Sequence, residues 1–75
     1  MEVFSNIGCG KCALLKKWLE NEQIEYIERN VATDPSAMAI LRENGFRSFP
    51  QVRINGEFIE IGAYDFSAIK EHLEG

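Results

Sequence analysis

The first half of the chain alternates short apolar runs with an amphipathic stretch. The segment Glu2–Ser5 is apolar in its middle and predicts a buried strand. Leucine and tryptophan then recur at helical spacing over residues 14–19, which predicts a helix ending near Asn21. The stretch 24–31, "IEYIERNV", mixes β-branched and aromatic residues with charges, as is typical of a strand near a sheet edge. The crossover through the helix makes these two strands parallel.

The segment "TDPSAMAILRENG" carries the start and stop signals of a second helix. Asp34 or Thr33 can cap its first turn, and Pro35 suits the first helical position. Gly45 suits the left-handed conformation that often follows a helix end. We therefore predict a helix between these residues.

The stretch "PQVRINGEFIEI" predicts a β-hairpin, because Asn-Gly is the preferred pair for a two-residue type I′ turn. A turn at Asn55-Gly56 sets a register in which one face is nearly all apolar. The expected pairs are Ile54 with Glu57, Val52 with Ile59, and Pro50 with Ile61.

A last helix is expected to start at a cap on Asp65 and to end at Gly75. The predicted order is therefore β-α-β-α-β-β-α, in a single domain that spans residues 1–75. This is an α/β fold with a four-stranded mixed sheet and three helices on its faces.

Charge and composition narrow the class of protein. The formal net charge is −4, whereas a nucleic-acid binder is normally basic, so we expect no nucleic-acid partner. No apolar run is long enough to span a bilayer, and no signal peptide is visible. We therefore expect a cytoplasmic protein, in a compartment where cysteine pairs are usually redox-active or metal-bound.

The two cysteines of the chain stand close together in "SNIGCGKCALLKK". A disulfide between Cys9 and Cys12 would close a very small loop and stabilise the fold little. A structural zinc site takes four protein ligands, and His72 is the only histidine, so a metal site would need a dimer or an added thiol. Two inert core cysteines are the third interpretation. A C-x-x-C motif between a strand and a helix in a βαβ unit favours a redox pair.

The position of Cys9 predicts its chemistry. Unpaired N–H groups and the helix dipole favour a thiolate at a helix N-terminus. In such motifs the cysteine pKa falls from about 8.5 into a range of about 3.5–7.5, and Lys11 adds a positive charge nearby. Cys9 is thus expected to attack, while Cys12, one turn further and more buried, resolves the mixed disulfide.

The chain resembles the glutaredoxins and the related NrdH-type redoxins of the thioredoxin superfamily. The resemblance rests on "CGKC", "SFPQV" and "IGAYD", and it covers essentially the whole chain in the same element order. It implies a four-stranded thioredoxin-like fold and thiol–disulfide exchange. It also implies that Cys9 is the nucleophile and Cys12 the resolving thiol.

The same resemblance implies a substrate site around Pro50. A single X-Pro bond is most often trans, but the family pattern implies a cis proline beside Cys9. It also implies that the backbone of Phe49 pairs with the substrate and that Gly62 lets the substrate approach closely. The residues expected to contact substrate or glutathione are Lys11, Phe49, Pro50, Gly62, Ala63 and Asp65. Arg42 or Arg47 could hold a further glutathione carboxylate, although each is more often a solvated surface charge.

The resemblance leaves the electron source open. Typical glutaredoxins use glutathione and carry a proline-aromatic pair where this chain has Gly10-Lys11. "ENGFRSFPQV" resembles NrdH-type redoxins, which take electrons from thioredoxin reductase and reduce ribonucleotide reductase. We expect a monomer without an obligatory cofactor or metal that reduces protein disulfides or glutathione-mixed disulfides. One alternative is an iron–sulfur module, a dimer that holds a cluster through Cys9 and glutathione. Another is a partner-binding domain whose cysteines do not turn over.

Overall fold

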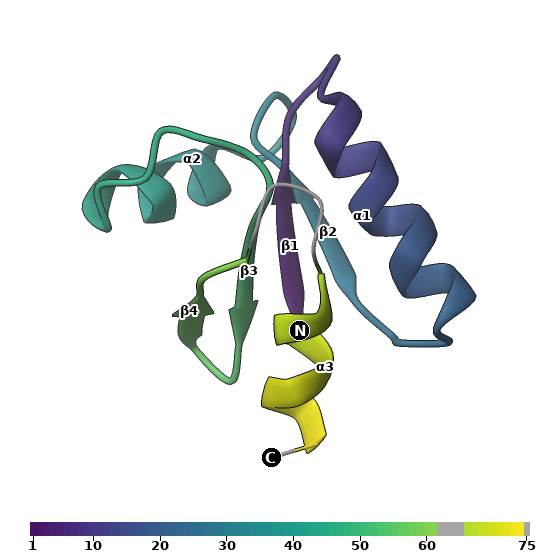
Figure 1. Cartoon of the computed structure of the whole chain (residues 1–75). Coiled ribbons are helices and arrows are strands. Elements are labelled where there is room, and N and C mark those ends of the chain that lie inside the picture. Colours follow the sequence, from purple (N-terminus) through teal and green to yellow (C-terminus); the bar gives the residue numbers. More distant parts are fainter. Residues whose placement is uncertain (62–65, 75) are drawn as a thin grey trace.

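The seven helices and strands follow the predicted order (Figure 1). The computed structural model describes residues 1–61 and 66–74. Its elements are β1 (Glu2–Ser5), α1 (Gly10–Asn21), β2 (Ile27–Asn30), α2 (Pro35–Glu43), β3 (Gln51–Ile54), β4 (Glu57–Ile59) and α3 (Ser67–Glu74). The predicted cap at Asp65 and the predicted end at Gly75 lie outside the described residues.

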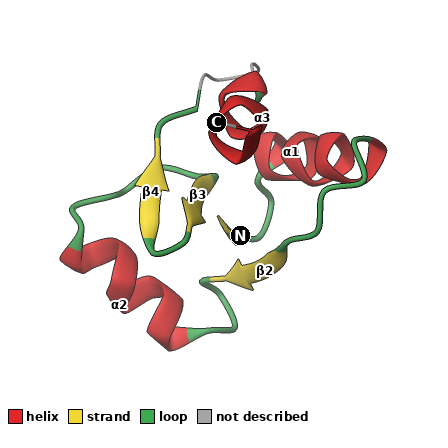
Figure 2. Ribbon diagram, turned by 90° about the horizontal axis from the view of Figure 1, so that it is seen from below, coloured by secondary structure: helices red, strands yellow, loops and turns green. Residues whose placement is uncertain are grey.

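The four strands form one mixed sheet in the order β2-β1-β3-β4. β1 pairs with β2 in parallel and with β3 antiparallel, and β3 pairs with β4 antiparallel. Figure 2 shows α1 and α3 on one face of the sheet and α2 on the other. The predicted four-stranded sheet is confirmed, and β2 is an edge strand as expected.

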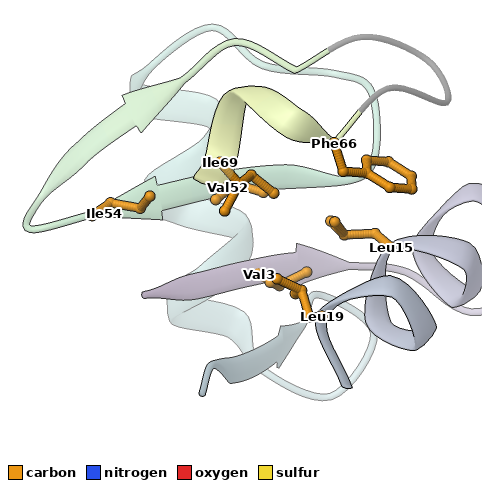
Figure 3. Packing of buried hydrophobic residues seen from close by; sticks show 7 residues of the cluster. All are labelled: Val3, Leu15, Leu19, Val52, Ile54, Phe66 and Ile69. Carbon is orange, nitrogen blue, oxygen red and sulfur yellow. The ribbon is translucent and has the colours of Figure 1, made fainter. Parts of the chain in front are cut away.

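Each face of the sheet has its own apolar core. Beneath α1 and α3 the buried side chains are Val3, Leu15, Leu19, Val52, Ile54, Phe66 and Ile69 (Figure 3). Trp18 is half-buried and packs against this cluster, with its ring centroid 5.8 Å from that of Phe66. Beneath α2 the buried residues are Phe4, Val31, Ala37 and Leu41. β1 contributes to both cores because Val3 and Phe4 point to opposite faces.

Local signals set the ends of α2 as predicted. The Asp34 carboxylate accepts hydrogen bonds from the backbone N–H groups of Ser36 (3.1 Å) and Ala37 (3.2 Å). Pro35 occupies the first helical position, where its missing N–H costs nothing. Gly45 has a φ of +75°, the left-handed conformation expected after the helix end.

The hairpin also has the predicted register. Asn55 and Gly56 both have positive φ, as a type I′ turn requires, and Val52 pairs with Ile59. The expected pair of Pro50 with Ile61 is not part of the ladder between β3 and β4, whose outermost pair is Val52 with Ile59. Proline has no N–H to donate to a ladder, so β3 starts one residue later.

The second strand is shorter than the predicted range 24–31. Ile24 belongs to the C-terminal cap of α1 and not to the strand. Its N–H donates a hydrogen bond to the Leu19 carbonyl at 2.9 Å. β1 begins opposite Ile27, so residues 24–26 have no strand beside them with which to pair. The edge strand therefore covers only Ile27–Asn30.

A charged network joins three of the strands on the α2 side. The Glu2 carboxylate accepts hydrogen bonds from Arg53 Nε (2.7 Å) and Arg29 Nη1 (3.0 Å). The two guanidinium groups lie 5.4 and 5.5 Å from the centroid of the Phe4 ring, within cation–π range. Arg29 also pairs with Asp34 at 3.1 Å, which ties the start of α2 to the sheet. The network therefore fixes β2, β1 and β3 relative to one another.

We predict that Glu2→Gln lowers the free energy of unfolding by about 1–3 kcal/mol, because charge-assisted hydrogen bonds to two partly buried arginines are lost. Urea denaturation at pH 7 measures this change. Glu57→Gln is the matched control, since this strand residue is exposed and makes no ion pair with any residue that the structure describes. Equal destabilisation by both variants would show that the network contributes nothing specific.

We also predict that the protein loses stability in acid. The Arg53 hydrogen bond lowers the pKa of Glu2 from 4.5, and hydrogen bonds from Ser36 and Arg29 lower the pKa of Asp34 from 3.8 to about 2. The unfolded chain therefore binds protons that the folded chain does not, so stability falls as the pH drops from about 5 to about 2. Urea titrations across this range should show the decline, and Glu2→Gln should make it shallower. A free energy of unfolding that is flat down to pH 3 would contradict the prediction.

Candidate active site

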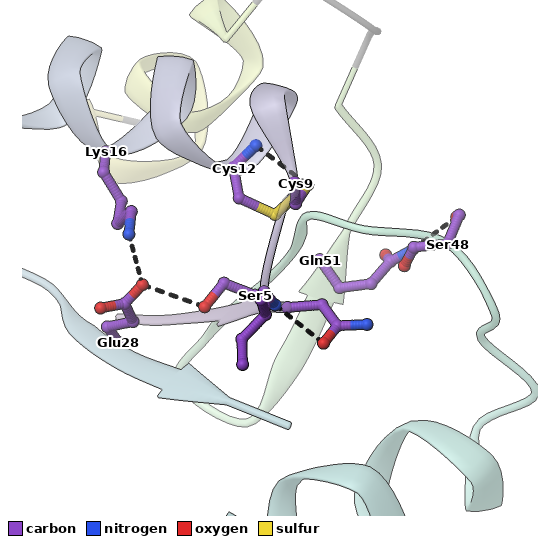
Figure 4. The surroundings of a disulfide bond; sticks show 9 residues. Ser5, Cys9, Cys12, Lys16, Glu28, Ser48 and Gln51 are labelled. Atoms are coloured by element: carbon purple, nitrogen blue, oxygen red, sulfur yellow. Dashed lines mark hydrogen bonds and ion pairs between the residues drawn. A yellow bond between two sulfur atoms is a disulfide. The ribbon is translucent and has the colours of Figure 1, made fainter. Parts of the chain in front are cut away.

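The two cysteines form a disulfide at the junction between β1 and α1 (Figure 4). Their Cα atoms are 5.2 Å apart, and Cys9 is the N-cap residue of the helix. The preceding loop, residues 6–8, turns at Gly8, whose φ of +73° favours glycine. The end of the central strand thus places Cys9 at the edge of the fold and Cys12 one turn into the helix.

The sulfur of Cys9 takes the place of a capping oxygen. Cys9 Sγ accepts a hydrogen bond from the Cys12 backbone N–H at 3.2 Å. α1 has no acidic side chain in its first turn, so no carboxylate there competes with this sulfur for the partial positive charge of the helix N-terminus. The same geometry would stabilise a thiolate on Cys9 in the reduced protein.

The two sulfur-bearing residues differ in access. Cys9 is half-buried, whereas Cys12 is only 2% exposed. The prediction that Cys12 is the more buried cysteine is therefore confirmed. An external thiol or disulfide can approach the Cys9 side of the pair more readily than the Cys12 side.

A groove that reaches Lys11, which stands between the two cysteines in the chain, is lined by three of the predicted contact residues. The Phe49–Pro50 peptide bond is cis, as the family resemblance implied. Lys11, Phe49 and Pro50 line an open cavity of about 520 Å³. Side chains that the sequence did not single out complete its wall, among them Phe46, Gln51 and Phe58. The other predicted contacts, Gly62, Ala63 and Asp65, lie outside the described residues.

A polar cluster that sequence reasoning missed lies next to the disulfide. Ser5, only 1% exposed at the end of β1, donates a hydrogen bond to the Glu28 carboxylate at 3.0 Å. Lys16 on α1 pairs with the same carboxylate oxygen at 2.6 Å (Figure 4). The Lys16 hydrogen bond lowers the pKa of Glu28, and the Glu28 hydrogen bond raises the pKa of Lys16. Both groups are therefore charged at neutral pH.

One sequence signal for this cluster was present. Lys16 follows Cys12 by four residues and so lies on the same face of α1. Its partner Glu28 is twelve residues further along the chain and meets it only because the sheet brings β2 beside β1.

Two further features, a metal-binding cluster and a membrane-spanning helix, are absent from the described residues. Among residues 1–61 and 66–74, no three or more His, Cys, Asp or Glu side chains are grouped so that they could hold a metal ion. None of the helices in these ranges is long and apolar enough to cross a membrane.

Comparisons with known proteins place the chain in a family. The family model for glutaredoxin matches residues 1–59. Two glutaredoxin-like NrdH proteins from Lactococcus lactis are each 34% identical over 50 residues, which is 67% of this chain and 69% of theirs. The crystal structure of the thioredoxin-like protein BC3987 has a TM-score of 0.77 and 27% identity, covering 93% of this chain and 94% of that one.

A second solved structure, the buckwheat glutaredoxin–glutathione complex, has a TM-score of 0.68 and 28% identity. The match covers 99% of this chain and 68% of the buckwheat chain. These neighbours share the thioredoxin-like arrangement of strands and helices described above. Because the family model covers most of the residues and the fold agrees with it, the chain belongs to the glutaredoxin family.

Proposed function

We propose that this protein is a dithiol redoxin that reduces disulfide bonds in proteins. The observation that carries the proposal is the Cys9–Cys12 disulfide at the N-terminus of α1, with one accessible and one buried cysteine. Membership of the glutaredoxin family supports thiol–disulfide oxidoreductase activity as the general class. Cys9 is the proposed nucleophile and Cys12 the proposed resolving thiol.

The proposed reaction moves two electrons in two exchanges. The Cys9 thiolate attacks one sulfur of the substrate disulfide, and the other substrate sulfur leaves as a thiolate that takes up a proton. Cys12 then loses its proton and attacks Cys9 Sγ, which releases the second substrate sulfur as a thiol. The substrate is reduced, and the protein ends with the Cys9–Cys12 disulfide.

The groove beside Pro50 is the proposed substrate site. Lys11, Phe49 and Pro50 line it together, within reach of the first turn of α1. In our proposal the Phe49 backbone pairs with the substrate, and Gly62, Ala63 and Asp65 complete the contacts. Glutathione-mixed disulfides are a second substrate class, supported by the likeness to a glutaredoxin that was solved with glutathione.

The electron source in the proposal is glutathione or thioredoxin reductase. Ribonucleotide reductase is a candidate acceptor, supported by the "GFRSFP" stretch and by the relatives that carry the NrdH name. Two coupled assays separate the reductants, one with glutathione and its reductase and one with thioredoxin reductase. The faster NADPH oxidation identifies the source. We place this chemistry in the cytoplasm.

The iron–sulfur alternative depended on Gly10 as a residue that opens the site. Apart from its two chain neighbours and the backbone of its own helix, no described atom lies within 4 Å of a Cβ atom built on Gly10. Open space at this position does not distinguish the iron–sulfur alternative from the dithiol redoxin. The alternative stays a prediction.

We predict that iodoacetamide modifies Cys9 at least about tenfold faster than Cys12 in the reduced protein at pH 7, because Cys9 is accessible and held as a thiolate. Trypsin cleaves after Lys11 and separates the two cysteines, so mass spectrometry reports each rate. The urea-unfolded protein is the control, in which both rates should converge. Preferential modification of Cys12 would contradict the proposed roles.

We predict that Cys9→Ser abolishes reduction of a protein disulfide such as that of insulin. Cys12→Ser should retain the first exchange but accumulate a mixed disulfide, visible on a non-reducing gel, with turnover reduced by about tenfold or more. Cys12→Ser is therefore the matched control for Cys9→Ser. Undiminished insulin reduction by Cys9→Ser would refute the assignment of the nucleophile.

A further inference from the structure

A second cavity adjoins the active-site groove. It has a volume of about 540 Å³ and lies between the second half of α2 and the loop that leads to Pro50. Its floor is apolar, with Met38, Leu41, Phe46 and Phe49. Phe46 and Phe49 line the active-site groove as well, so the two cavities share a wall.

Two arginines complete the lining of this cavity, and neither is neutralised by the described part of the protein. Lys16, Arg29, Arg53 and Lys70 each have a carboxylate oxygen within 3.1 Å. Arg42 and Arg47 form no ion pair with any carboxylate in residues 1–61 and 66–74, and both are exposed. In a chain of net charge −4, these two free positive charges are therefore gathered around one apolar hollow.

We propose that this second cavity binds an acidic segment of the protein substrate. An apolar side chain of that segment seats against Met38 and Leu41, while a neighbouring carboxylate pairs with Arg42 or Arg47. The planar guanidinium group suits a carboxylate because it can donate two parallel hydrogen bonds. The inference rests on the proposed disulfide reduction, and it assigns acidic and apolar residues a few positions from the reactive cysteine of the substrate.

The two cavities suit one extended ligand. In the proposed function a substrate joined to Cys9 occupies the groove beside Pro50. The shared wall of Phe46 and Phe49 connects this groove to the cavity that Arg42 and Arg47 line. The arginines lie outside the cysteine motif, so they act on binding rather than on the exchange of sulfurs. Exposed charges of this kind change the association rate and its dependence on salt.

The test uses two disulfide-bonded peptides that differ only near one cysteine, one with Leu-Glu-Glu and one with Leu-Gln-Gln. The reduced full chain is mixed with an excess of each peptide, and peptide reduction in a single turnover is followed by acid quench and chromatography. We expect the acidic peptide to react about three- to tenfold more efficiently, through a lower half-saturating concentration and an unchanged limiting rate. The preference should shrink between 50 mM and 500 mM salt, values chosen to span about a threefold change in screening length.

Three variants separate the arginines from general charge. Arg42→Gln and Arg47→Gln should each lose part of the preference for the acidic peptide. Lys17→Gln removes the same charge from an exposed residue of α1 that does not line the cavity, and it should keep the preference. Replacing the peptide leucine by serine should weaken binding to the wild-type protein and to Lys17→Gln alike.

Several outcomes overturn the inference. Equal half-saturation by the acidic and neutral peptides shows that the cavity does not select carboxylates. An equal loss in Lys17→Gln shows that only net charge matters. An arginine effect seen with glutathione disulfide but not with the peptides shows that the cavity serves the tripeptide. If neither peptide is reduced while the protein is fully reduced and folded, the proposed function itself fails.

Discussion

The burial of β1 on both faces is the constraint on which the rest of the structure depends. Val3 and Phe4 are adjacent, have no exposed surface, and belong to different cores. Only a strand can send neighbouring side chains to opposite faces in this way. A chain of 75 residues can bury only a limited apolar surface. A single strand that contributes side chains to both cores therefore helps to stabilise both faces of the sheet. The end of the same strand leads through a short loop to Cys9, so the position of Cys9 depends on a strand that is buried on both faces.

Charge is divided between structure and surface. On one face, Glu2 joins Arg29 and Arg53 across three strands. At the carboxyl end of β1, Ser5 and Lys16 meet the carboxylate of Glu28. These charged groups form ion pairs, are partly buried, and link neighbouring strands and helices to one another. The arginines near the end of α2 are different, because no described carboxylate compensates them. A negatively charged protein thus retains local positive charge beside its reactive groove.

Sequence reasoning succeeded where the chemistry is local. The Asp34 cap, the Asn55-Gly56 turn and the spacing of the cysteines each depend on residues a few positions apart, and each was found as predicted. The limits of β2 and the pairing of Lys16 with Glu28 depend on where another strand begins, which no local pattern contains. The cis form of Pro50 followed from the family resemblance and not from the residues alone. The arginine-lined cavity arises only when α2 and the following loop fold together.

The position of Cys9 as the N-cap links the stability of α1 to the chemistry of the sulfur. The sulfur that forms and breaks bonds is also the atom that satisfies the first turn of α1. A protonated thiol is a poorer hydrogen-bond acceptor than a thiolate. A sulfur in a mixed disulfide carries no charge and directs its lone pairs differently, so it too accepts a different hydrogen bond from the thiolate. The strength of this one hydrogen bond therefore depends on the chemical state of Cys9. The first turn of α1 and the exchange of sulfurs at Cys9 are energetically coupled through it.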